Sequence, residues 1–120
     1  MDLRRKRAYD TAEPGDGFRV LVDRLWPRGV SKDRAAIDLW AKEVAPSPEL
    51  RKAWHAAETD ADFDECAARY RSELSGDDAE ALDELVAAIR GKDVVTLVYA
   101  LHDEEHTHAI VLEEVLRDRV

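Results

Sequence analysis

The chain has 120 residues, of which 45% are hydrophobic and 38% charged, and its formal net charge is −9. These values predict one soluble domain over residues 1–120 with a single core, exclude a disordered chain, and argue against non-specific binding to nucleic acid. The single cysteine excludes an internal disulfide, and no apolar run is long enough to span a membrane, so we expect a cytoplasmic protein.

Three strands are predicted in the first half of the chain. Their expected limits are 3–10, 18–26 and 37–44. The second of them contains Val20, Leu21 and Val22, a run that is apolar on both faces and typical of a parallel strand covered on both sides. Pro27 and Gly29 end this strand.

Helices dominate the rest of the chain. After a short turn that Ser31 caps, the expected helices are 47–57, 59–74, 77–91 and 107–120. The intervening segment 93–100 is almost wholly apolar, which predicts a central strand. Strands that alternate with helices indicate an α/β fold: a single three-layer domain with a mostly parallel sheet of about four strands and helices on both faces.

Two polar segments follow predicted strands. Residues 23–32 come after the second strand, and residues 101–108 come after the last one. Because ligands of parallel α/β sheets bind at the carboxyl ends of the strands, we expect these two segments to meet in one site.

The same segments carry a family resemblance. The runs RLWPRGVSK and EHTHA, in order with DGFRVLVD, DLWAKEVAPSPELRKAWHA and VVTLVYA, resemble the YeaO-like branch of the bacterial domain of unknown function 488 along nearly the whole chain. This resemblance implies a small cytoplasmic α/β protein and leaves the reaction open. Its characteristic polar positions correspond here to Asp23, Arg24, Trp26, Pro27, Arg28, Gly29, Ser31, Lys32, Trp40, Lys42, Pro46, Ser47, Arg69, Tyr70, Asp103, His106 and His108. The chain departs from the family pattern at His102 and Thr107, where lysine and asparagine are usual.

The first polar segment is a candidate anion site. Arg24, Arg28 and Lys32 could converge on a phosphate, because guanidinium groups bind its oxygens in a bidentate manner, and Trp26 could form a wall. The alternative is that Asp23 pairs with a neighbouring arginine, that Trp26 belongs to the core, and that the remainder is a solvated loop. The candidate ligand-binding residues are Asp23, Arg24, Trp26, Arg28, Ser31 and Lys32.

The second polar segment supplies the candidate catalytic residues His106, His108 and Asp103. At a helix start, either histidine could donate to a phosphate or act as a general acid or base, with Asp103 as its orienting carboxylate. The alternative is that Asp103 caps the turn and the histidines are ordinary hydrogen-bonded residues. Histidines two apart diverge by about 200° on a helix, which does not match a zinc signature, so we assign no metal ligand.

The sequence therefore leaves several functions open. One is an enzyme or binder acting on a small anionic ligand, phosphate- or nucleotide-like, at the carboxyl edge of the sheet. Another is a non-catalytic protein-interaction or nucleotide-binding module, and metal binding is the least favoured. The classical glycine fingerprint of dinucleotide sites and the P-loop lysine are absent, so no cofactor is assigned, and no membrane partner is expected.

Overall fold

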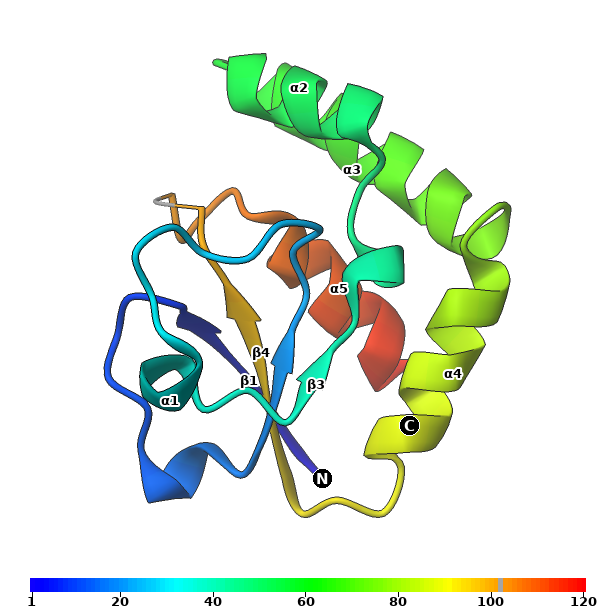
Figure 1. Cartoon of the computed structure of the whole chain (residues 1–120). Coiled ribbons are helices and arrows are strands. Elements are labelled where there is room, and N and C mark those ends of the chain that lie inside the picture. Colours follow the sequence, from blue (N-terminus) through cyan, green and yellow to red (C-terminus); the bar gives the residue numbers. More distant parts are fainter. Residues whose placement is uncertain (102) are drawn as a thin grey trace.

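A four-stranded parallel sheet lies at the centre of the computed structural model, which describes residues 1–101 and 103–120 (Figure 1). Its strands, in the spatial order β1-β4-β2-β3, are β1 (Asp2–Arg7), β4 (Val94–Tyr99), β2 (Phe18–Leu21) and β3 (Leu39–Trp40). The predicted α/β fold and parallel sheet are confirmed. The apolar segment predicted to be central is β4, which pairs with β1 on one side and β2 on the other.

The expected helices occur in order along the chain, and two further short helices form where a turn and the end of a strand were expected. They are η1 (Pro14–Asp16), α1 (Lys32–Ala35), η2 (Lys42–Val44), α2 (Pro48–Ala56), α3 (Asp60–Ser75), α4 (Ala79–Ile89) and α5 (His108–Arg117). Ser31 and Ser47 cap α1 and α2 as predicted, since their hydroxyl oxygens accept hydrogen bonds from the backbone N–H groups of Arg34 and Leu50. Among the described residues, no helix is long and apolar enough to cross a membrane.

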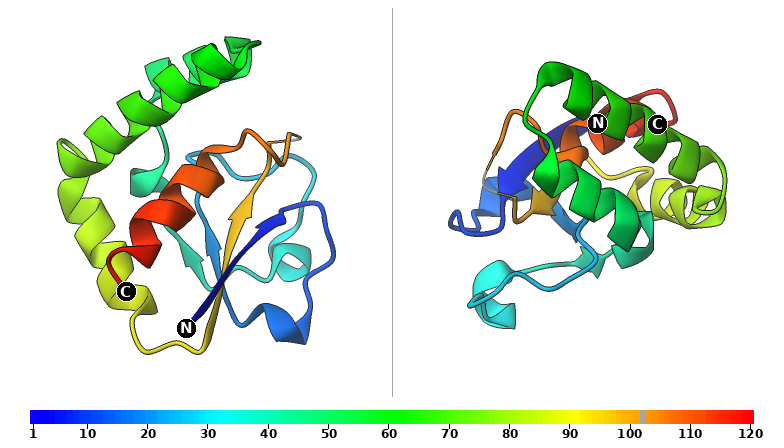
Figure 2. Two further views of the ribbon diagram at one scale, coloured as in Figure 1. Left: turned by 180° about the vertical axis from the view of Figure 1, so that it is seen from behind. Right: turned by 90° about the horizontal axis from the view of Figure 1, so that it is seen from above.

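The two faces of the sheet are covered unequally. Helix α5 packs on β1 and β4, and α2, α3 and α4 complete this layer around the main core, in which Leu97, Tyr70 and Leu112 are fully buried. The opposite face carries the short helix α1 and the surrounding loops over a small cluster of Leu21 and Val98. Figure 2 shows α1 and α5 on opposite sides of the sheet.

All four predicted strands are shorter than expected, and two of them are much shorter. The second strand ends at Leu21, because after Val22 donates its N–H to the carbonyl of Val98, the side chain of Asp23 takes over the contact with the neighbouring strand. The predicted strand at 37–44 pairs with β2 only over Leu39–Trp40 and then tightens into η2.

The carboxyl ends of β1, β4 and β2 meet at one edge of the sheet. In Figure 1 these strands point toward α2, which lies beyond this edge. The polar segments that follow β2 and β4 are thereby brought together beneath α2, as expected for a parallel sheet.

Candidate functional site

A cavity of about 370 Å³ opens at the carboxyl edge of the sheet. Residues that follow β1, β2 and β4 form one side of it, and α2 with the segment before it forms the other. The lining residues are Tyr9, Asp23, Arg24, Leu25, Trp26, Pro27, Arg28, Ala45, Pro46, Arg51, Trp54, His55, Ala100, Leu101 and His108. The volume falls in the usual range of small-molecule sites.

The buried end of the cavity holds a carboxylate–imidazole pair. Asp23 Oδ1 lies 3.3 Å from His108 Nε2, and the side chains are only 16% and 12% exposed. Asp23 Oδ2 accepts a hydrogen bond of 2.8 Å from the N–H of Ala100, and His108 Nε2 donates to the carbonyl of Val22 at 3.0 Å. Each partner is thus fixed by the backbone of a neighbouring strand.

Burial shifts both pKa values of this pair toward the neutral forms. Desolvation raises the pKa of the Asp23 carboxyl, while the nearby His108 opposes that rise. Desolvation also lowers the pKa of His108, whose ring meets Trp54 and Tyr70 edge-on at centroid distances of 6.2 and 5.8 Å. Burial thus favours the neutral form of His108, whose Nε2 proton is donated to the carbonyl of Val22.

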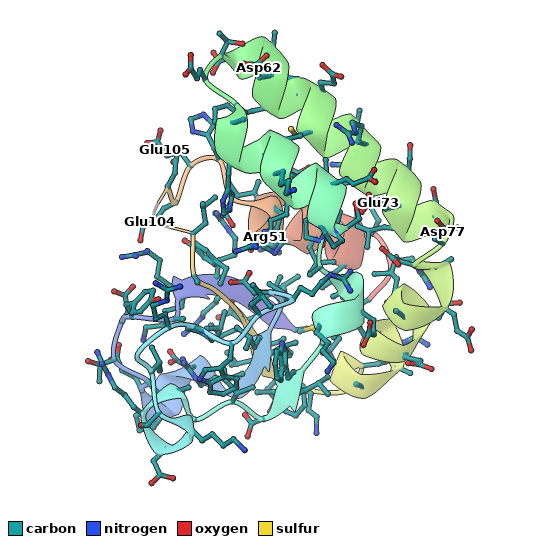
Figure 3. All side chains as sticks on the ribbon, turned by 45° about the horizontal axis from the view of Figure 1, so that its top comes forward. Arg51, Asp62, Glu73, Asp77, Glu104 and Glu105 are labelled. Carbon is teal, nitrogen blue, oxygen red and sulfur yellow. The ribbon has the colours of Figure 1, made fainter. Side chains whose placement is uncertain are left out.

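Three arginines contribute positive charge to the cavity. Arg24 is half-buried and anchored, because its guanidinium donates to the carbonyls of Ala45 and Pro46 at 3.2 and 3.4 Å. Arg28 and Arg51 are exposed at the rim, and their side chains form no hydrogen bond or ion pair with another described residue. Figure 3 shows Arg51 reaching from α2 toward the ends of the strands.

Aromatic side chains form the walls. Trp26 packs edge-on against Trp40 at 5.5 Å between ring centroids and donates its indole N–H to the carbonyl of Val30. Trp54 is buried and donates its indole N–H to the carbonyl of His106. Trp26 belongs only partly to the core, because its ring packs on the face of the sheet that carries α1 and also lines the cavity.

Four of the six predicted ligand-binding residues line this cavity: Asp23, Arg24, Trp26 and Arg28. Ser31 and Lys32 do not, because they form the start of α1 on the other face of the sheet. Asp23 pairs with His108 and the N–H of Ala100, and its carboxylate forms no ion pair with a described arginine.

The predicted catalytic residues divide between two places. His108 lines the cavity, whereas His106 and Asp103 lie outside its lining. Asp103 accepts hydrogen bonds from the N–H of Glu105 and from His106 Nδ1, so it caps the turn. The ring of His106 stacks on Phe63 of α3, with ring centroids 4.0 Å apart. His102, where the chain departs from the family pattern, falls outside the described residues.

The two histidines are expected to titrate on opposite sides of the ordinary value of histidine. The hydrogen bond that His106 donates to Asp103 raises the pKa of His106, and burial lowers the pKa of His108. Imidazole titration by NMR should therefore give a higher pKa for His106 than for His108. Asp103→Asn should lower the pKa of His106 and leave that of His108 unchanged; equal pKa values in the parent protein would contradict this geometry.

Sequence reasoning missed the contribution of α2 to the cavity. Arg51, Trp54 and His55 all line it. Their spacing of i, i+3 and i+4 places them on one face of a helix, a signal that was present in the sequence. The spacing does not show that this face turns toward the ends of the strands, because that orientation depends on where α2 crosses the edge of the sheet.

Other reactive groups lie apart from the cavity. Within residues 1–101 and 103–120, no three histidine, cysteine, aspartate or glutamate side chains are grouped so that they could hold a metal ion. Cys66 is buried on the apolar face of α3, and burial raises the pKa of its thiol, so it is a core residue.

Comparison with known proteins agrees with the resemblance seen in the sequence. A family model described as the inactive DUF488-N3 subclade matches residues 2–120. The uncharacterized protein YeaO of Escherichia coli is 45% identical over 118 residues, covering 98% of each chain. The uncharacterized protein Rv3073c of Mycobacterium tuberculosis is 44% identical over 117 residues, covering 98% of this chain and 95% of its own. No solved structure matches. The chain therefore belongs to the YeaO-like family of the DUF488 proteins.

Proposed function

We propose that this protein binds a small anionic molecule, of phosphate or nucleotide type, in the cavity at the carboxyl edge of the sheet. The observation that carries the proposal is the convergence of Arg24, Arg28 and Arg51 on one cavity of an acidic protein. Among the described lining residues Asp23 is the one carboxylate, so the local balance is positive even though Arg24 Nη1 lies 3.8 Å from Glu43 Oε2. Guanidinium groups at a rim suit an anion that enters from solvent.

Binding without turnover is the form of the proposal that we favour. The family model that matches this chain is described as an inactive subclade. The described lining residues of the cavity include no serine, threonine or cysteine that could act as a nucleophile. The acidic net charge also argues against an extended polyanion such as nucleic acid as the ligand. We place the protein in the cytoplasm, which the single cysteine supports.

A second candidate is an enzyme that uses acid–base chemistry. The specific observation in its favour is the pair of Asp23 and His108, since buried carboxylate–imidazole pairs with shifted pKa values are common in active sites. In this candidate, His108 would exchange a proton with the ligand and Asp23 would orient its ring. Release of inorganic phosphate or loss of the bound compound over time would favour it over simple binding.

The test is calorimetric titration of inorganic phosphate, sugar phosphates and nucleoside monophosphates into the protein. We expect Arg51→Ala and Arg28→Ala each to weaken binding by about tenfold or more, because a hydrogen bond to a charged group contributes about 1.5–3 kcal/mol. Lys32→Ala is the matched control: it removes one positive charge near Arg28 in sequence but outside the cavity, and should leave affinity unchanged.

Two results would overturn the proposal. One is the absence of binding by every compound in the panel. The other is an equal loss of affinity in Lys32→Ala and Arg51→Ala, which would indicate attraction to overall charge and not to the cavity.

A further inference from the structure

We infer that the ligand carries hydroxyl or amine donors beside its anionic group, and that Asp23 selects it by accepting from one of them. This inference rests on the proposed function and concerns the chemical class of the ligand. It follows from the polarity of the cavity, which differs between the rim and the buried end. The rim presents the exposed side chains of Arg28, Arg51 and His55, whereas the buried end presents the carboxylate of Asp23.

The carboxylate of Asp23 is incompletely paired. The N–H of Ala100 donates a hydrogen bond of 2.8 Å to Oδ2, but among the described residues the nearest donor to Oδ1 is His108 Nε2 at 3.3 Å. The single proton on that nitrogen is already donated to the carbonyl of Val22 at 3.0 Å. A carboxylate has about four acceptor positions, so most of those on Asp23 have no donor among the described residues.

Asp23 Oδ1 is also reachable from the cavity. Asp23 lines the cavity, and its Oδ1 is not among the fully enclosed unpaired atoms of the described residues. A carboxylate in this position repels a ligand that offers only acceptor oxygens and attracts one that offers an O–H or N–H.

Apolar surfaces in the cavity favour a carbon skeleton. Pro27 is buried, Trp54 is only 6% exposed, and both line the cavity together with the arginines and the carboxylate. A molecule that spans this space would have its phosphate at the rim and its donors at the buried end. The class that fits is a polyhydroxylated phosphate ester, such as a sugar phosphate or the ribose phosphate part of a nucleotide.

The test compares two phosphate esters, one with hydroxyl groups and one without. Ribose 5-phosphate and pentyl phosphate share a phosphate ester and a five-carbon skeleton, but the second has no hydroxyl groups. Calorimetry with the unmodified protein should give tighter binding of ribose 5-phosphate by about tenfold. Asp23→Asn should reduce this preference several-fold, because the amide keeps the size of the side chain, uses its oxygen for Ala100, and replaces the charged acceptor with a neutral N–H₂ donor.

The control is Asp103→Asn, which removes a carboxylate outside the cavity and should keep the preference. A merely structural role of Asp23 would change stability but not the ratio of the two affinities. If Asp23→Asn does not fold, the unmodified protein still tests the inference, because only ribose 5-phosphate should shift the NMR resonances of His108. Equal binding of both probes would overturn the inference and leave the proposed function standing, whereas binding of neither would overturn both.

Discussion

Replacing Gly17 with alanine is expected to lower the free energy of unfolding by about 2–5 kcal/mol. Gly17 joins η1 to β2 with φ at 65°, in the left-handed region that favours glycine. A Cβ atom at this position would lie 2.7 Å from the Cβ of Val94 and still closer to the carbonyl oxygen of that residue. Strand β4 or the turn would have to move, and urea denaturation measures the cost.

Two other glycines are matched controls for this substitution. Gly29 also has a positive φ, 79°, but a Cβ there would have no neighbour within 4 Å, so Gly29→Ala should cost about 1–2 kcal/mol. Gly15 has neither constraint, and Gly15→Ala should change stability by no more than about 0.5 kcal/mol. A loss in Gly17→Ala no greater than that in Gly29→Ala would contradict the close approach of η1 to β4.

The position of Gly17 matters to the candidate site because it lies where β2 and β4 begin to pair. Phe18 is aligned with Val95 and Leu21 with Val98, and the same register continued beyond the strands aligns Asp23 with Ala100. The hydrogen bond between these two residues is therefore the last contact of the strand pair. A shift in the pairing at the amino end of the sheet would separate them.

The sequence predicted the elements of this fold where its signals are local. The apolar run of β4, the cap and proline that begin α2, and the glycine and proline that end β2 are each contained in a few adjacent residues. The lengths of β2 and β3 were overestimated because a strand ends where its backbone pairing ends, and β2 ends where the side chain of Asp23 takes over the contact with the chain after β4. The pairing of β2 with β3 is limited to two residue pairs, which the alternation of apolar residues does not reveal.

The candidate site was predicted only in part, for the same reason. Arg24 and Arg28 were placed correctly at the strand end, but Lys32 follows a loop that the Trp26–Val30 hydrogen bond closes before α1 begins on the other face. The partner of Asp23 is His108, which lies far away in the sequence and approaches through the packing of α5 on β1 and β4. The predicted divergence of His106 and His108 assumed that both lie on one helix, but α5 begins at His108, so the path of the chain before the helix and tertiary packing decide which of them faces the cavity.

Trp54→Ala is expected to lower the free energy of unfolding by about 3–5 kcal/mol, the usual cost of truncating a buried tryptophan. Trp54 is 6% exposed, packs edge-on against Tyr70 and His108, and donates to the carbonyl of His106. It therefore connects α2 with α3 and with the start of α5. Thermal or urea unfolding measures the loss.

The same substitution should raise the pKa of His108 toward the ordinary value of histidine. Trp54 is one of the two aromatic rings against His108, so its removal admits water to an imidazole whose neutral form is favoured by desolvation.

The control for this prediction is Trp54→Phe. It keeps a ring beside His108 and loses the hydrogen bond to His106, so it should cost about 1–2 kcal/mol and leave the pKa of His108 low. A Trp54→Ala protein that is less stable but shows the same pKa for His108 would mean that Tyr70 and the strand ends alone exclude water from the Asp23–His108 pair. Trp54 would then serve to hold α2 in place, and the desolvated end of the cavity would belong to the sheet and α5.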